Sequence, residues 1–184
     1  MAMSAWPYPD PPLDDGVVAL RPWRAGDAPL IAAWGEDEEA VRWSAVPAGY
    51  TPEMASEYLE QAEQGRRAGR MLTMAIVDAG SGALLGSCDI RCPDPEDRGL
   101  GEVGYLVAAE ARGRGTATRV MRMIVEWAFR ELGMRRVQAL VHPDNPASVA
   151  VLVRLGFERE GLLRRYRPGG EDRIMFAIYS SPAS

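Results

Sequence analysis

Apolar residues recur along the chain at two spacings, one typical of strands and one typical of helices. Short apolar-rich stretches bounded by turn residues predict seven strands, at 17–21, 70–78, 84–91, 102–107, 137–142, 157–163 and 173–179. From Ala117 to Leu132, apolar residues recur three positions or one position apart, which predicts a helix buried along one face. Gly133 follows and favours its end.

Shorter helices are predicted from the residues that begin them. Asp27 is expected to cap a helix that runs to about Trp34, and a second covers 38–43. Thr51 and Pro52 suit the cap and first position of a third, and 146–155 forms a last helix before Gly156. With a glycine-containing hairpin turn at 79–82, this order predicts a single α/β domain with a mixed sheet.

The ends of the chain and its composition limit the class of protein. Residues 1–15 hold four prolines among small and acidic residues, which predicts a flexible, Pro-rich arm before a domain at 16–184. The chain has 184 residues, 47% of them hydrophobic, and no run approaches the roughly 20 apolar residues of a membrane span. The first 16 residues lack the basic start and apolar stretch of an export signal. We therefore expect a cytoplasmic protein without a membrane span.

Few side chains suit a disulfide or a metal site. In a strand, Cys88 and Cys92 would lie about 13 Å apart, too far for a disulfide. His142 is the only histidine, so no metal is expected. All 21 basic residues are arginine, which excludes lysine chemistry and a phosphate-binding loop lysine.

Charge is distributed unevenly. Residues 1–65 hold 12 acidic residues and three arginines, a net −9, in a chain whose total is −5. Residues 111–136 hold seven arginines and two glutamates, a net +5. This segment is expected to bind an anion.

The clearest sign of a binding site lies where the strand 102–107 leads through a glycine loop, Arg112-Gly-Arg-Gly-Thr-Ala117, into the long helix. Free N–H groups and the dipole at a helix start bind anions, and glycines let phosphate oxygens approach the backbone. A tight turn without a ligand is the alternative. A second group follows at Asn145-Pro-Ala-Ser148 and Gly156-Phe157, where helix capping alone would also explain Asn145.

Together, Arg-x-x-Gly-x-Ala at 112–117 and Asn-x-x-Ser…Gly-Phe at 145–157 resemble the GNAT superfamily of N-acetyltransferases. The segments Tyr50-Thr-Pro-Glu53 and Glu102-Val-Gly-Tyr105 and the hairpin at 161–172 resemble its ribosomal-protein N-terminal (Rim-type) branch. The resemblance covers about 17–180. It implies a mostly antiparallel sheet of about seven strands, splayed between the fourth and fifth and flanked by helices.

The resemblance also implies acetyl-CoA as the acetyl donor and a primary amine, of a protein N-terminus or a small molecule, as the acceptor. The pyrophosphate is expected on the loop amides, and the pantetheine beside the strand and Asn145. The residues expected to bind acetyl-CoA are Leu106, Val107, Ala108, Arg112, Gly113, Arg114, Gly115, Thr116, Ala117, Thr118 and Asn145.

Three side chains are candidates for catalysis by direct attack in a ternary complex. The family often places an acidic residue in the fourth strand near the acceptor, so Glu102 is the first candidate for the base. His142 is the second, because histidine titrates near neutrality. The resemblance places Ser148, or in relatives a tyrosine elsewhere, near the leaving sulfur, and an ordinary first-turn serine is the alternative. If the strand bulges near 106–108, a backbone N–H there is expected to stabilise the oxyanion.

Other interpretations remain open. A catalytically silent acyl-CoA-binding sensor shares every binding feature, and each candidate side chain also has an ordinary structural role. Nucleic-acid binding fits the arginine-rich segment but not the net charge. The acidic residues 37–39 either attract a cationic amine or form a solvated face. An edge strand or the arm would allow a homodimer.

Overall fold

Seven strands form one sheet in the order β1-β2-β3-β4-β5-β7-β6. The computed structural model describes residues 5–181. Neighbouring strands are antiparallel except β4 and β5, which run parallel. This confirms the predicted mixed, mostly antiparallel sheet. The strands are β1 (Val18–Arg21), β2 (Met71–Asp78), β3 (Leu84–Arg91), β4 (Leu100–Val107), β5 (Arg136–Val141), β6 (Glu158–Leu163) and β7 (Arg173–Tyr179).

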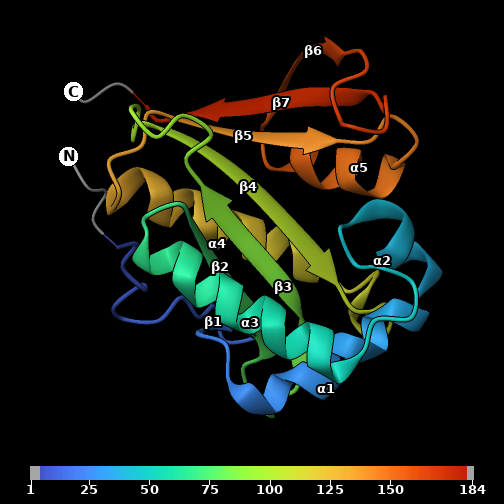
Figure 1. Ribbon diagram of the computed structural model, residues 1–184. Coiled ribbons are helices and arrows are strands. Elements are labelled where there is room, and N and C mark those ends of the chain that lie inside the picture. The colour runs from blue at the N-terminus through green and yellow to red at the C-terminus, as the bar shows by residue number, and fades with distance from the viewer. Residues whose placement is uncertain (1–4, 182–184) are drawn as a thin grey trace.

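Helices cover both faces of the sheet, with α3 on one face and α4 on the other (Figure 1). The α-helices are α1 (Ala28–Ala32), α2 (Glu38–Trp43), α3 (Pro52–Arg67), α4 (Thr116–Arg130) and α5 (Pro146–Arg154). The start of α3 is as predicted, because the Thr51 hydroxyl oxygen accepts a hydrogen bond from the Met54 N–H at 3.3 Å. Within residues 5–181, no helix has the length and apolar character needed to cross a bilayer.

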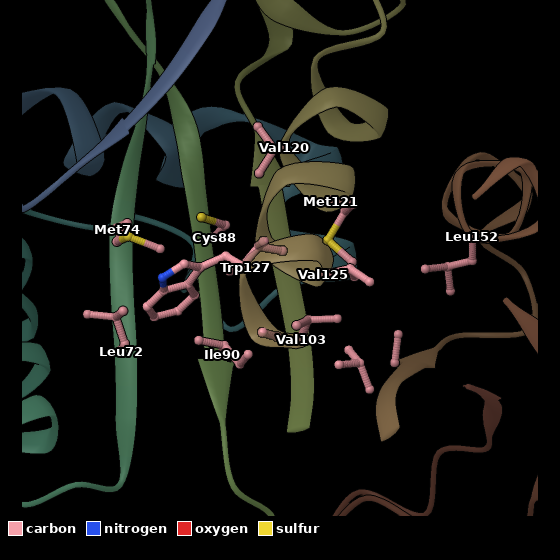
Figure 2. Close-up of a cluster of buried hydrophobic side chains, with 14 of the residues drawn as sticks. Leu72, Met74, Cys88, Ile90, Val103, Val120, Met121, Val125, Trp127 and Leu152 are labelled. Carbon is pink, nitrogen blue, oxygen red and sulfur yellow. The ribbon is translucent and has the colours of Figure 1, made fainter. Parts of the chain in front are cut away.

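The larger core lies between α4 and the sheet. Along α4, Val120, Met121, Ile124 and Ala128 are fully buried, as the apolar spacing predicts. Figure 2 shows Trp127 lying over Leu72 and Met74 of β2, while Met121 and Val125 face Leu152 of α5. One helix therefore holds together the first strands of the sheet and the helix that follows β5.

The predicted helix at 27–34 is wrong in detail. Its residues form α1 between two 3-10 turns, Ala25–Asp27 and Ala33–Glu36. The Asp27 side chain does not cap α1; it accepts a hydrogen bond from the Arg24 N–H and pairs with both terminal nitrogens of Arg21, each at 2.8 Å. Burial alone would raise the pKa of Asp27, but these bonds outweigh it and lower the pKa.

The Pro-rich segment is packed rather than an unpacked arm, at least from residue 5. Trp6 is 1% exposed and belongs to the larger core. The indole N–H of Trp6 donates to the Gly69 carbonyl at 2.9 Å, and the Arg66 guanidinium donates to the main-chain carbonyl of Trp6 at 2.7 Å. The Pro-rich composition did not indicate that Trp6 is an anchor. Prolines disfavour regular helices and strands, but they do not prevent an aromatic side chain from packing into the core.

We predict that Trp6→Ala lowers the free energy of unfolding by about 3–5 kcal/mol, because it empties a fully buried aromatic site and leaves the Gly69 carbonyl without its partner. Urea denaturation measures the change. Val17→Ala is the control, since Val17 is 48% exposed. Equal stability of Trp6→Ala and the wild type would contradict the docking.

Candidate active site

The parallel strands β4 and β5 are paired over only three residues each, Leu100–Glu102 with Arg136–Gln138. Beyond this point β4 continues along β3 and β5 continues along β7. In Figure 1 the two strands start side by side and diverge toward their C-terminal ends. We call this opening the fork. The predicted splay between the fourth and fifth strands is therefore present.

The two faces of the sheet carry different chemistry at the fork. Side chains alternate between faces along a strand, so Glu102 and Tyr105 point to opposite sides. Tyr105 packs against the core on the α4 side. Glu102 lies on the α3 side, where its Oε2 accepts a hydrogen bond from the Gln138 amide of β5 at 3.0 Å. This bond spans the point where the strands part.

Beyond β4, the glycine loop turns the chain into α4. Gly113 and Gly115 have φ of +73° and +79°, a left-handed conformation that side chains other than glycine rarely adopt. Apart from the glycine itself and the residues on either side of it, no atom lies within 4 Å of where a Cβ would stand on either residue. The buried Thr116 hydroxyl donates to the Ala111 carbonyl at 3.1 Å and closes the turn. The first-turn amides of α4 thus begin at an open, glycine-lined surface.

The start of α5 lies beyond the mouth of the fork (Figure 1). The Asn145 side-chain oxygen accepts a hydrogen bond from the Ser148 N–H at 3.0 Å and so caps the helix. The Tyr105 hydroxyl donates to the Ser148 hydroxyl oxygen at 3.1 Å. The structure thus joins β4 to α5 through Tyr105 and Ser148, of which only Ser148 was a candidate for catalysis.

Comparison with known proteins identifies this arrangement. Residues 18–158 match the family model described as an acetyltransferase (GNAT) domain. The chain belongs to the GNAT acetyltransferase family. Members of this family are acetyl-CoA-dependent acyltransferases, and so is this enzyme.

Similar solved structures include Mycobacterium smegmatis RimJ in complex with CoA-disulfide, which is 31% identical, with a TM-score of 0.76 over 92% of this chain and 86% of that one. Ribosomal-protein-S5-alanine acetyltransferase from Vibrio fischeri, at 23% identity, shares the fold with a TM-score of 0.78 over 93% and 97%. Among curated relatives, the N-acetyltransferase p20 of Bacillus licheniformis is 25% identical over 81% of this chain and 83% of its own length.

The main-chain groups that face the fork differ from those expected. The Ala108 N–H donates to the Leu85 carbonyl of β3 at 2.8 Å, and alternate residues of an antiparallel strand turn their groups to the same side. The main-chain N–H and C=O groups of Leu106 and Ala108 therefore point to β3, whereas those of Tyr105 and Val107 point toward the fork. The expected bulge in this strand is absent, because β3 and β4 keep one register from Gly86–Val107 to Arg91–Glu102.

The two arginines of the glycine loop, Arg112 and Arg114, differ from each other in their partners. The Arg112 guanidinium binds the Asp37 carboxylate and lies 3.2 Å from Glu39, and its Nε donates to the Val107 carbonyl at 3.0 Å. Its bond to Asp37 lowers the pKa of that carboxyl. Arg114 is exposed and has no carboxylate partner within the described residues. Arg114 is therefore the cation open to a ligand, and Arg112 joins the loop to α2.

Glu102 sits in a group of polar side chains on the α3 face. Its Oε1 accepts from the Arg91 Nε at 3.1 Å, and the Arg91 Nη1 lies 3.6 Å from Asp89 Oδ1. Burial raises the pKa of Asp89, although the Arg91 guanidinium acts in the opposite direction. Two carboxylates thus share one guanidinium. A carboxylate has about four acceptor positions, so Glu102 keeps capacity for a further donor.

His142 lies at the end of β5 on the same face. Its Nδ1 accepts a hydrogen bond from the Asp144 N–H at 3.1 Å, which puts the proton of the neutral ring on Nε2. Its ring packs on Trp43 of α2, with 5.2 Å between the ring centroids. The basic nitrogen of His142 is thus occupied by the backbone, which favours Glu102 as the base.

Two surface cavities lie elsewhere. One of about 600 Å³ is lined by α3, Tyr8 and Trp23, and one of about 280 Å³ lies between α4 and α5 near Phe129. The candidate site is therefore defined by the diverging strands and the helix start.

We predict that Asp37→Asn lowers the free energy of unfolding by about 1 kcal/mol at pH 7, because it removes the charge pair with Arg112 but keeps a good helix cap. Asp37→Ala should lower the free energy of unfolding by about 1 kcal/mol more, because it also removes the helix cap. Since the pKa of Asp37 is lowered in the folded protein, the pair stabilises fully above the ordinary value of 3.8. The deficit of Asp37→Asn should therefore disappear as pH falls through the lowered pKa.

Urea denaturation from pH 7 down to pH 3 measures this effect. Glu38→Gln in the same helical turn is the matched control, because Glu38 is exposed and has no ion-pair partner within the described chain. A deficit of Asp37→Asn that persists unchanged at low pH would show that the charge pair is not its cause.

Proposed function

We propose that this enzyme transfers an acetyl group from acetyl-CoA to a primary amine by direct attack in a ternary complex. The fork carries the proposal, because it separates two sets of side chains on opposite faces of the sheet, Glu102 on one and Tyr105 with Ser148 on the other. When bound, acetyl-CoA supplies an acetyl thioester. The chain supplies an anion site, a proton acceptor and a hydrogen-bond donor.

The loop and strand fit such a coenzyme. The open surface at Gly113 and Gly115 and the amides of Thr116, Ala117 and Thr118 suit a diphosphate, with Arg114 as an added cation. The main-chain groups of Tyr105 and the Val107 N–H suit an amide-containing chain along β4, while the Val107 carbonyl is held by Arg112. The Asn145 amide nitrogen has no partner within the described residues and can donate to that chain, while its oxygen caps α5.

On the α3 face, Glu102 accepts a proton from the attacking amine, directly or through water. Two carboxyl groups, Asp89 and Glu102, flank the single guanidinium of Arg91, an arrangement that favours a cationic amine over a neutral one as the species that arrives. The likeness to the M. smegmatis RimJ supports a protein N-terminus as the first acceptor to examine, with small-molecule amines beside it.

On the α4 face, Ser148 donates a hydrogen bond to the departing sulfur. A thiolate with a pKa near that of cysteine, about 8.5, needs only this modest assistance. An acetyl-cysteine route has no support, because Cys88 and Cys92 are buried and burial raises the pKa of both thiols. A buried neutral thiol is a poor nucleophile.

We predict that saturating acetyl-CoA raises the melting temperature by about 5–10 °C at a hundredfold excess over its Kd. Gly115→Glu should abolish this shift, because the new carboxylate occupies and repels the anion site. Gly82→Glu is the matched control: Gly82 has φ of +73° and open space at its Cβ, but lies in the β2–β3 turn. Differential scanning fluorimetry measures all three proteins. Loss of the shift in both variants would show that backbone strain is responsible.

We predict that Glu102→Gln lowers kcat about 100-fold while acetyl-CoA still raises the melting temperature, because the amide keeps the shape but accepts no proton. Thiol release is followed across pH with peptides and small amines as acceptors. The acidic limb of the pH–rate profile should disappear in Glu102→Gln and remain in His142→Asn. The opposite result would assign the base to His142.

The same assay distinguishes the second function. A catalytically silent sensor would bind acetyl-CoA and show the thermal shift, yet release no thiol with any amine. Thiol release that depends on the amine supports the transferase.

A further inference from the structure

The Tyr105 hydroxyl of β4 reaches α5 across the mouth of the fork, through its bond to Ser148 at 3.1 Å. We propose that Tyr105 is a positioning residue for acetyl transfer, because its hydrogen bond sets the direction in which Ser148 donates. This rests on the proposed function, in which Ser148 assists the departing sulfur.

The backbone and the side chain of Ser148 are each held by one partner. Its N–H donates to the Asn145 side-chain oxygen at 3.0 Å, which places the residue in the first turn of α5. Its Oγ accepts from Tyr105. A serine hydroxyl has one proton and two lone pairs, so an oxygen that accepts from Tyr105 must direct its own proton to a third group. The remaining direction serves a ligand in the fork.

The hydrogen bond also strengthens that donation. A hydroxyl that accepts a hydrogen bond becomes a better donor, because chains of hydrogen bonds polarise one another. Burial raises the pKa of Tyr105, so the phenol stays protonated near neutral pH. Tyr105 therefore remains a donor to Ser148 at working pH.

A purely structural role predicts something different. In that case the bond only braces β4 against α5, and its loss weakens folding or acetyl-CoA binding whether or not Ser148 has a hydroxyl. If Tyr105 acts through Ser148, its hydroxyl has no effect on turnover once the serine oxygen is gone. The two roles are separated by a double-mutant cycle on kcat.

The experiment compares wild type, Tyr105→Phe, Ser148→Ala and the double variant in the thiol-release assay. We expect kcat to fall about 10-fold in Tyr105→Phe and about 100-fold in Ser148→Ala, with the KM for acetyl-CoA changed less than about twofold. The double variant should match Ser148→Ala within about twofold. Ser148→Thr, which keeps a hydroxyl, should retain most of the sensitivity to Tyr105→Phe.

Tyr8→Phe is the matched control, because Tyr8 is also a half-buried tyrosine bonded to a side chain, Glu63, but lies far from the fork. It should leave kcat unchanged. Melting temperatures with and without acetyl-CoA show whether each variant is folded and binds.

Losses in kcat that multiply in the double variant would overturn the positioning role, as would a Tyr105→Phe defect confined to stability or to the KM. A wild-type enzyme that shows the thermal shift but releases no thiol with any amine would overturn the proposed function itself, and the role of Tyr105 with it. The two failures are therefore distinguishable.

Discussion

The arrangement of the molecule depends on a parallel strand pair that stops early. β4 and β5 are joined over only three residues each, and each is then held by an antiparallel partner on its outer side, β3 for one and β7 for the other. Because sheets twist, two strands held by different partners move apart once their own pairing ends. The main-chain groups of Tyr105 and the Val107 N–H are left facing the gap, whereas the Val107 carbonyl accepts from Arg112. Polar backbone groups need partners. A ligand with amides of its own meets that need, so the fold creates a binding site where its hydrogen bonding is incomplete.

Period-two alternation then divides the chemistry at the gap. Glu102 and Tyr105 are three residues apart on one strand, which sends a carboxylate to the α3 face and a phenol to the α4 face. The Glu102–Gln138 bond lies where the strands part, and the Tyr105–Ser148 bond joins the two sides farther along. In the proposed reaction, a proton is accepted on one face and a hydrogen bond is donated on the other, with the thioester between them.

Local patterns predicted the elements, and long-range pairs account for what they missed. Apolar spacing located α4, and Thr51-Pro52 located the start of α3, because both depend on neighbours within one or two helical turns. Arg112 pairs with Asp37 from 75 residues away, and Tyr105 reaches Ser148 across 43. No spacing rule contains such information. Trp6 gave a weak indication of packing, which the Pro-rich composition outweighed in the prediction. A tryptophan among prolines is compatible with a packed segment as well as with a free arm.

The net charge of the sequence is a poorer guide to anion binding than the backbone. Residues 111–136 carry a net +5, yet four of their seven arginines form ion pairs in the structure: Arg112 with Asp37, Arg119 with Asp15, Arg135 with Asp97 and Arg136 with Glu160. Three of these partners lie before the segment and one after it. The field that reaches the loop is accordingly much weaker than +5 suggests. Under the proposed function, selectivity for a diphosphate rests on groups that the ion pairs do not neutralise. These are the glycines that allow close approach, the amides that begin α4, and Arg114, which is exposed and has no carboxylate partner within the described residues.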